Sequence, residues 1–146
     1  SQLDHLDCNN NQLTELDVTS CTQLTLLYCY ENQLNKLDVI KCSQLDYLDC
    51  NNNQLTELGV TSCTELTELY CYDNILSELD VRSCTKLTIL SCGYNFLIQL
   101  DLTKCTELTE LYCIQEDDID CITVNKEQSE KYSWDKDNFT TYCIGI

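Results

Sequence analysis

The feature that most constrains this chain is a repeat of 21 residues that runs through most of it. A leucine opens each unit, at Leu3, Leu24, Leu45, Leu66, Leu87 and Leu108. In register the unit reads L-x-x-L-x-C-x-x-N-x-L-x-x-L-D-V-x-x-C-x-x, and the first five units all carry both cysteines and the asparagine. A fixed period of this length predicts a solenoid, in which neighbouring turns share one hydrophobic core.

The composition excludes several other classes of protein. The 146 residues suit one domain, and a hydrophobic share of 43% is enough for a continuous core. Proline is absent and glycine occurs only three times, which argues against a collagenous chain or a flexible linker. The net charge of −17 would repel phosphate backbones and anionic lipids, so we expect neither nucleic-acid binding nor membrane insertion.

The alternation of residues within a unit predicts which side chains are buried. Along a strand, successive side chains point to opposite faces, so Leu48 and Cys50 are expected to point inward and Tyr47 and Asp49 outward. The second half of the unit, residues 55–60, would return the chain along the other side of the stack with its apolar residues inward.

Two polar positions recur in the turns. The asparagine is expected to bond neighbouring backbone groups through its side-chain amide, forming a ladder that satisfies an otherwise buried loop. The aspartate at Asp17, Asp38, Asp80 and Asp101 is interpreted as a turn-bonding residue rather than a metal ligand. Its replacement by Gly59 in one unit favours this structural role.

These motifs resemble the leucine-rich repeat family, whose pattern is L-x-x-L-x-L-x-x-N/C-x-L. The 21-residue unit is most similar to repeats of Bacteroidetes surface proteins and of cysteine-ladder internalins, over residues 3 to about 124. It departs from many such relatives in its second cysteine, where they carry asparagine. The resemblance implies an α/β-type repeat solenoid, predominantly β, with a concave parallel sheet and a mostly non-helical convex side. It also implies a bacterial setting, at the cell surface or secreted.

The repeat ends within its sixth unit. The pattern breaks after Cys113, and the apolar residues of 119–124 recover it if one residue is inserted. We therefore divide the chain into a repeat array, residues 1–124, and a C-terminal cap, residues 125–146, in which Trp134 and Phe139 resemble the cap of such arrays. The first unit has no comparable cap, so we expect the chain to be a fragment of a longer protein.

Thirteen cysteines invite a chemical interpretation. Eleven of them form two ladders with one sulfur per turn along a line, which cannot surround a zinc ion. We interpret these eleven as small buried hydrophobic residues. Cys121 and Cys143 lie outside the ladders, and we predict a disulfide between them that closes a loop of about 20 residues.

Catalysis is not expected from this sequence. The single histidine, His5, cannot assemble a Ser–His–Asp set, and no phosphate-binding glycine loop or H-E-x-x-H motif is present. We expect no enzyme activity, no metal and no cofactor.

The outward positions of the predicted sheet are rich in tyrosine and acid and hold no lysine or arginine. Such a surface is typical of rigid amphipathic contact sites, although aromatic residues also favour strands for structural reasons. The residues predicted to bind a partner are Tyr28, Tyr30, Tyr47, Asp49, Tyr70, Tyr72, Asp73, Tyr94 and Tyr112.

The functional hypothesis is a monomeric, non-enzymatic module that recognises a protein partner, for which a basic protein is one candidate, through its concave face. Two alternatives stay open at this stage. One is a glycan-binding adhesin module, because tyrosine rings stack on sugars while Asp and Asn bond hydroxyls. The other is an architectural spacer in a surface protein.

Overall fold

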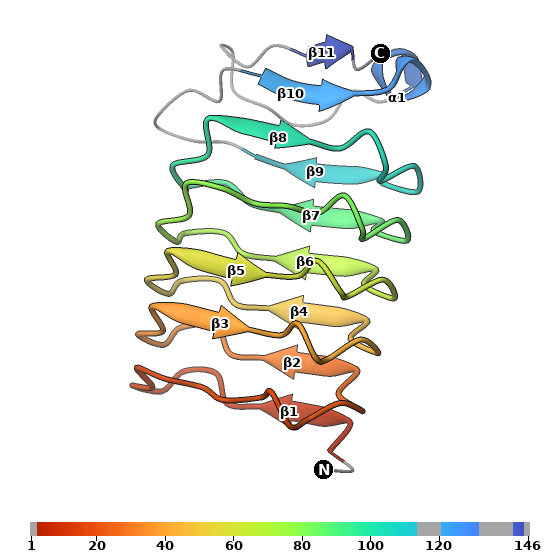
Figure 1. The fold of residues 1–146 in the computed structure, drawn as a ribbon. Helices are drawn as coiled ribbons and strands as arrows, with labels where there is room; N and C mark the ends of the chain where they lie inside the picture. The colour runs from red at the N-terminus through yellow and green to blue at the C-terminus, as the bar shows by residue number, and fades with distance from the viewer. Residues whose placement is uncertain (1–2, 114–120, 132–141, 145–146) are drawn as a thin grey trace.

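The computed structural model describes residues 3–113, 121–131 and 142–144, which form a solenoid of parallel strands (Figure 1). One side carries a six-stranded sheet in the order β1-β2-β4-β6-β7-β9. Its strands are three residues long: β1 His5–Asp7, β2 Leu26–Tyr28, β4 Tyr47–Asp49, β6 Glu68–Tyr70, β7 Ile89–Ser91 and β9 Glu110–Tyr112. Every pair in this sheet is parallel with partners 21 residues apart, as in Leu27 and Leu48, so each repeat adds one strand.

The opposite side of the stack is paired only in parts. There β3 (Lys36–Asp38) pairs with β5 (Glu57–Gly59), and β8 (Gln99–Asp101) pairs with β10 (Cys121–Val124). β10 also pairs with β11 (Tyr142–Ile144). Residues 78–80, which lie between β5 and β8 in the stack, form no strand. We call this side, with residues 78–80, the convex side.

The register between β8 and β10 confirms the insertion predicted in the sixth unit. Leu100 pairs with Ile122, an offset of 22 residues (122 − 100) instead of the 21 of the earlier turns. Ile122 and Val124 are fully buried, as the recovered pattern requires.

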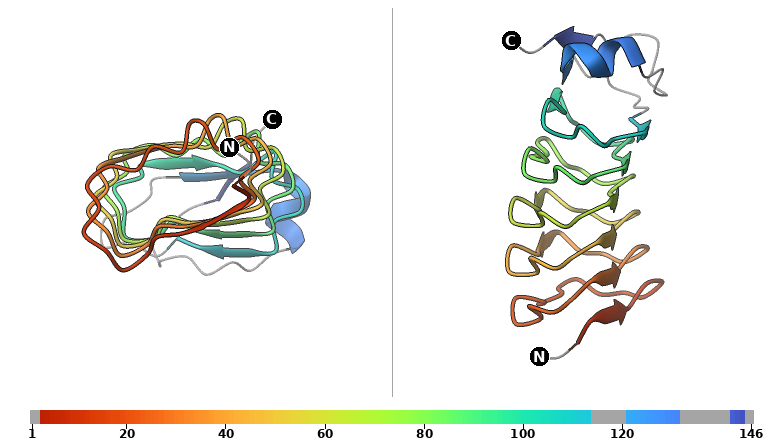
Figure 2. Two further views of the ribbon diagram at one scale, coloured as in Figure 1. Left: turned by 90° about the horizontal axis from the view of Figure 1, so that it is seen from below. Right: turned by 90° about the vertical axis from the view of Figure 1, so that its right-hand side faces the viewer.

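The core runs along the whole stack between the two sides. Leu48, Cys50, Leu55 and Val60 have no exposed surface, whereas Tyr47 and Asp49 are half-buried at the surface. The predicted alternation is therefore confirmed for both halves of the unit. A view along the stack shows each turn as a flat loop directly over the last (Figure 2).

The asparagine ladder is also confirmed. In each of the turns from the second to the fifth, the side-chain amide donates to carbonyl oxygens of its own turn and of the preceding turn. Its oxygen accepts from a backbone N–H of the preceding turn, as Asn74 Oδ1 does from Leu55 at 3.0 Å. The ladder thus satisfies backbone groups that the core would otherwise leave without partners.

The recurring aspartate acts as a turn residue. In Asp17, Asp38, Asp80 and Asp101 the carboxylate accepts from the N–H two residues later, at 3.0–3.1 Å. This Asx-type bond is local and needs no metal. Gly59 makes no such bond because it has no side chain.

Gln128 closes the last described turn on the convex side. In the second to fifth turns, the second cysteine donates its thiol proton to a valine carbonyl of the preceding turn, as Cys105 Sγ does to Val81 O at 3.4 Å. At the equivalent carbonyl of Leu102 the donor is the amide of Gln128, at 3.0 Å, and the same nitrogen also donates to Cys105 O at 2.9 Å.

Gln128 belongs to the short helix α1 (Lys126–Lys131) and also caps it. The N–H of Gln128 donates to Asn125 Oδ1, and the N–H of Asn125 donates to Gln128 Oε1, which is the reciprocal pattern of a capping box. Trp134 and Phe139, which resemble the cap of such arrays, lie outside the described residues, so their part in the cap stays a prediction.

Candidate functional site

The candidate site is the outer face of the six-stranded sheet, which we call the sheet face. It consists of the first and third residues of each strand, because the middle residue points into the core. Tyr28, Tyr47, Asp49 and Tyr70 are half-buried on this face, and Tyr112 is 44% exposed. Five of the predicted residues therefore lie where the sequence placed them.

Three tyrosines form a continuous line of rings that we call the tyrosine row. The ring centroids of Tyr28 and Tyr47 are 4.8 Å apart, and those of Tyr47 and Tyr70 are 5.5 Å apart. Tyr47 stands at the first position of its strand and the other two at the third, so the contacts run diagonally across neighbouring strands. Tilted pairs at these distances are favourable for aromatic rings and hold the side chains in place.

His5 extends the tyrosine row at its N-terminal end. Its ring centroid lies 5.6 Å from that of Tyr28. Sequence reasoning considered His5 only for catalysis and missed this role. The signal was present, because His5 and Tyr47 occupy the same position in two nearly identical units. The row itself was not predicted either, because Tyr28 and Tyr70 occupy the third position of their strands while the bridging Tyr47 occupies the first.

Carboxylates accompany the rings along the strands. The hydroxyl of Tyr70 donates to Glu68 at 2.9 Å, and that of Tyr112 donates to Glu110 at 2.7 Å. Each pair is two residues apart in one strand and therefore on the same face. Burial raises the pKa of Asp49, while the N–H of Asn51 donates to its carboxylate at 3.1 Å. Burial, with Asp49 and other nearby groups, raises the pKa of Tyr47 to about 12, so the central ring of the row is uncharged at neutral pH.

The remaining predicted residues lie beyond the strand ends, in the asparagine loops. Tyr30 and Tyr72 are half-buried there, and the rings of Tyr72 and Tyr94 lie 5.1 Å apart. Asp73 and Tyr94 have positive φ angles of 53° and 50°, so they occupy the left-handed turn of the loop. Their predicted place on the strands is wrong, because the chain already bends away from the sheet at these positions. The structure thus separates the predicted set into five residues on the sheet face and four in the asparagine loops, where Tyr72 and Tyr94 form a pair of rings.

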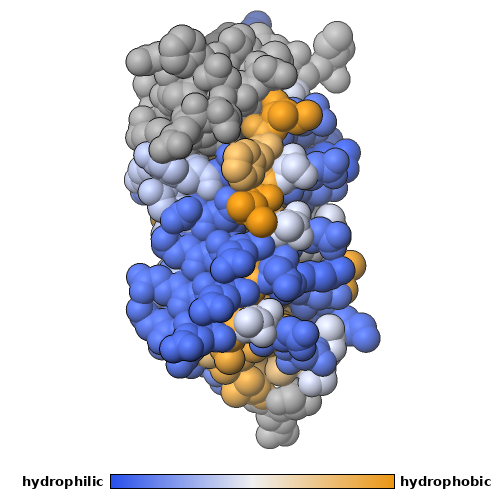
Figure 3. Space-filling model, turned by 90° about the vertical axis from the view of Figure 1, so that its left-hand side faces the viewer, coloured by the Kyte–Doolittle hydropathy of each residue, from blue (hydrophilic) through white to orange (hydrophobic). Residues whose placement is uncertain are grey.

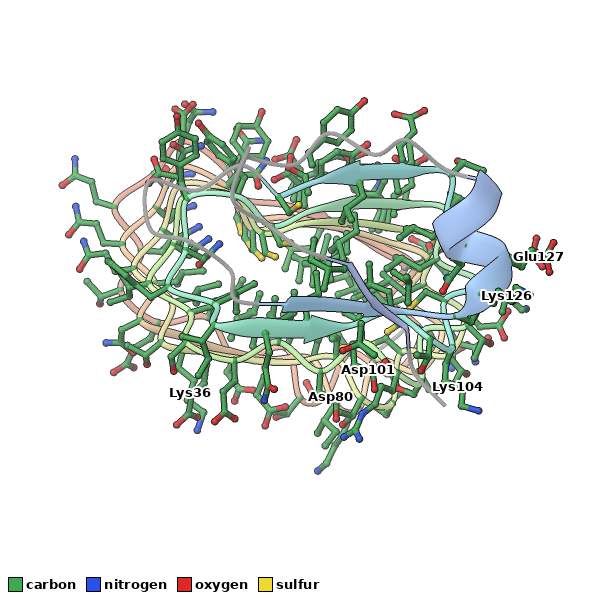
Figure 4. All side chains as sticks on the ribbon, turned by 90° about the horizontal axis from the view of Figure 1, so that it is seen from above. Lys36, Asp80, Asp101, Lys104, Lys126 and Glu127 are labelled. Carbon is green, nitrogen blue, oxygen red and sulfur yellow. The ribbon has the colours of Figure 1, made fainter. Side chains whose placement is uncertain are left out.

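Basic residues are kept away from the sheet face. Lys36 pairs with Glu57 at 2.9 Å, and Arg82 pairs with Asp80 at 2.7 Å, both on the convex side. Viewed along the stack, Lys36, Asp80, Asp101 and Lys104 point outward from that side, while the sulfur atoms lie inside the stack (Figure 4). The sheet face therefore combines neutral rings with carboxylates that no lysine or arginine on the same face neutralises.

The ladder thiols are not suited to nucleophilic chemistry. Ten of the eleven described cysteines are buried and all eleven are free, which confirms their interpretation as core residues. Burial raises the pKa of Cys71 and of Cys105 to about 12, so these thiols keep their protons at neutral pH. Within the described residues, no group of three or more histidine, cysteine and acidic side chains is arranged to hold a metal ion.

The disulfide between Cys121 and Cys143 stays a prediction, because both side chains lie outside the described residues. The backbone register pairs Cys143 with Thr123, two residues along from Cys121. A bridge would therefore require β10 and β11 to move from this register, since a disulfide joins Cα atoms that are at most about 7 Å apart. Peptide mapping without reductant would reveal it.

No helix in the described segments has the length and apolar character needed to cross a bilayer.

The repeats, the ladders and the parallel stack agree with the comparisons. The family model for leucine-rich repeats (2 copies) matches residues 43–84. The functional domain of InlJ from Listeria monocytogenes, which includes a cysteine ladder, is 36% identical to this chain, with a TM-score of 0.80. That match covers 97% of this chain and 36% of the InlJ chain. This chain is a leucine-rich repeat protein with a cysteine ladder.

More distant structures share the leucine-rich repeat fold. The internalin InlF from Listeria monocytogenes is 24% identical with a TM-score of 0.74, over 99% of this chain and 43% of InlF. A leucine-rich repeat protein of Leptospira interrogans is 21% identical with a TM-score of 0.71, over 98% of this chain and 38% of that protein. The chain thus spans less than half the length of each of these proteins. A comparison with curated protein sequences finds no significant match.

Proposed function

We propose that this leucine-rich repeat module is a non-enzymatic recognition domain that binds a protein partner through its sheet face. The observation that carries the proposal is the tyrosine row, in which Tyr47 contacts Tyr28 and Tyr70 at 4.8 and 5.5 Å. These rings are held by one another and by a rigid sheet, so little side-chain entropy is lost when a partner covers them. Large, pre-ordered rings near the centre of a surface are the residues that typically dominate binding energy.

The charge of the sheet face favours a basic partner. The hydroxyl of Tyr70 already donates to Glu68, which leaves that carboxylate able to accept from an incoming lysine or arginine. An arginine could at the same time lie over a tyrosine ring, which adds a cation–π contribution. The net charge of −17 would increase the rate of encounter with such a partner at low ionic strength.

The resemblance to bacterial internalins supports a proposal about where the protein acts. We propose that the protein acts as a monomer outside the bacterial cell or on its surface, as part of a longer protein. A bound nucleic acid, membrane insertion and a resident cofactor form no part of the proposal.

The test uses two arrays of immobilised ligands, one of extracellular proteins and one of glycans. Each is probed with the wild-type protein, with Tyr47→Ser/Tyr70→Ser, and with the convex-side control Lys41→Ala/Lys104→Ala. We expect protein signals that weaken with added salt, that vanish for the tyrosine variant and that persist for the control. Binding confined to glycans would support the adhesin alternative and contradict this proposal, as would protein signals that only the control variant loses.

A further inference from the structure

A second surface stands out on the convex side, away from the sheet face. A groove of about 520 Å³ lies between residues 77–82 of the fourth unit and residues 96–101 of the fifth, with Thr123 at one end. The groove lies where two neighbouring turns of the convex side are not paired as strands. Residues 78–80 form no strand, and among the described strands β8 pairs only with β10, the next strand of the convex side toward the C-terminus. The buried side chains of Leu79 and Leu100 belong to its lining.

The rim of this groove carries apolar side chains that the fold does not require. Phe96 is 54% exposed and Ile98 is 62% exposed, and Ile75 nearby in the preceding loop is 44% exposed. Figure 3 shows a hydrophobic patch on this side of the molecule, bordered by hydrophilic residues and separate from a second apolar region at the N-terminal end of the stack. At the positions of Phe96 and Ile98 the third unit has Gln54 and Thr56, so polar residues fit the same turn.

The apolar residue at position 98 also lacks a hydrogen bond that its equivalent in the third unit makes. Thr56 uses its hydroxyl to donate to Asn35 O in the preceding turn, at 3.2 Å, and Ile98 has no group that could do the same. An exposed apolar cluster that replaces a hydrogen-bonding residue costs solubility and gains nothing for the core. Such clusters usually mark a site of interaction.

The charged residues that line the groove indicate which kind of ligand fits it. Its lining includes three carboxylates, of Glu78, Asp80 and Asp101, and one basic residue, Arg82. Arg82 forms an ion pair with Asp80, to which its Nε and Nη2 donate at 2.9 and 2.7 Å, so these two charges offset each other. Glu78 and Asp101 therefore leave the groove negative. A second copy of this chain would bring the same acidic surface and a net charge of −17, which opposes self-association here.

We infer that this groove is a second binding site, which takes a segment of a protein partner with an apolar side chain next to a lysine or arginine. The apolar side chain would cover Phe96 and Ile98, and its basic neighbour would reach Glu78 or Asp101. The groove and the sheet face lie on different sides of the molecule, so the proposal for one surface can be wrong while the proposal for the other is right.

The probe is a displayed library of random heptapeptides, selected on the wild-type protein alone. The affinity of each enriched peptide is then measured for the wild type and for Phe96→Gln/Ile98→Thr. This variant carries the residues of the third unit, so it is expected to fold. Peptides kept by the selection should combine an apolar residue with an adjacent Lys or Arg. Their affinity should fall about tenfold or more in the double variant, because exposed aromatic and aliphatic anchors dominate such contacts.

Two further variants complete the test. Glu78→Gln should weaken the salt dependence of peptide binding, and Tyr47→Ser should leave the affinity unchanged. The inference is wrong if no peptide is enriched, or if the enriched peptides are acidic or lack an apolar residue. It is also wrong if they bind the Phe96→Gln/Ile98→Thr variant as well as the wild type, or if Tyr47→Ser abolishes binding. Dimerisation in sedimentation experiments that the double variant removes would show that a second copy occupies the groove, which also contradicts it.

Discussion

The side-chain amide of Asn74 and the carbonyl oxygen of Cys50 belong to successive turns and are joined by a hydrogen bond of 3.1 Å. The same amide donates to Cys71 O in its own turn at 3.1 Å, and its oxygen accepts from the N–H of Leu55 at 3.0 Å. Asn74 is only 4% exposed, so water cannot replace these bonds. One side chain therefore ties two turns together.

Replacing Asn74 should accordingly be costly. Asn74→Ala leaves the buried N–H of Leu55 without its acceptor, and we expect it to lower the free energy of unfolding by about 3 kcal/mol. The matched control is Asn11→Ala, since the amide of Asn11 donates only within its own exposed turn, to Cys8 O and Asn9 O. Urea unfolding of both variants measures the difference, and equal losses would mean that the ladder between turns contributes little.

The contacts of Gln128 predict a second large effect. Gln128→Ala removes the donor to Leu102 O and Cys105 O and half of the capping box, so we expect a loss of about 2–3 kcal/mol in the free energy of unfolding. Glu127→Ala is the control, because Glu127 is exposed on the same helix. A melting temperature that falls no further for Gln128→Ala than for Glu127→Ala would remove Gln128 from the closing role.

The buried thiols predict that stability falls at high pH. Burial raises the pKa of Cys63 from 9.0 to about 12 and that of Cys84 from 9.0 to about 11, so the folded protein keeps protons that the unfolded chain releases. The free energy of unfolding should therefore be independent of these groups below pH 9 and decline between pH 9 and 12. Each such thiol contributes about 1.4 kcal/mol per pH unit between pH 9 and its own folded pKa, which is about 11 for Cys84 and about 12 for Cys63.

The variant Cys63→Ala checks this origin. It should cost about 1–2 kcal/mol at pH 7 through the lost side-chain volume, yet make the decline above pH 9 less steep. Unfolding curves at several pH values between 7 and 11 provide the comparison. A decline of unchanged slope would assign the alkaline loss to other groups.

Gly59 offers a stabilising substitution. A Cβ atom placed there lies 3.9 Å from Asp38 Oδ1, which is ordinary van der Waals contact, and Gly59 does not have a positive φ. Gly59→Asp should restore the turn bond that Asp38 and Asp80 make in the neighbouring units, and raise the free energy of unfolding by about 1 kcal/mol. Gly59→Ala, which gains only the backbone effect, should be less stable than Gly59→Asp. The reverse order would mean that repulsion by Asp38 outweighs the new bond.

The sequence was sufficient to predict the structural roles of residues that recur from unit to unit. It was insufficient to predict contacts made by residues that occur in only one or a few units. The position of Leu48 in the core, the ladder of Asn74 and the turn role of Asp80 all follow from a residue type that recurs at a fixed spacing. The tyrosine row could not be predicted in the same way. It depends on the diagonal reach of Tyr47 between strands, which the position in the unit alone does not determine.

Other features escaped sequence reasoning because they occur once. Gln128 replaces a ladder thiol from outside the repeat, so no period points to it. Phe96 and Ile98 depart from the polar residues of earlier units, and this departure was visible in the sequence, but only the structure shows the groove between them and residues 77–82. Asp73 and Tyr94 were misplaced because the chain makes a left-handed turn at their position in the unit, beyond the end of the strand.

The most direct test of the proposed recognition surface is the dissociation rate constant of the complex with a protein identified on the array. Tyr47→Ala removes the ring that joins Tyr28 and Tyr70, and we predict dissociation about tenfold faster or more, with a nearly unchanged association rate constant. Lys41→Ala on the other side should leave both constants as in the wild type. If Tyr47→Ala dissociates at the wild-type rate while Lys41→Ala dissociates faster, the sheet face is not the binding surface.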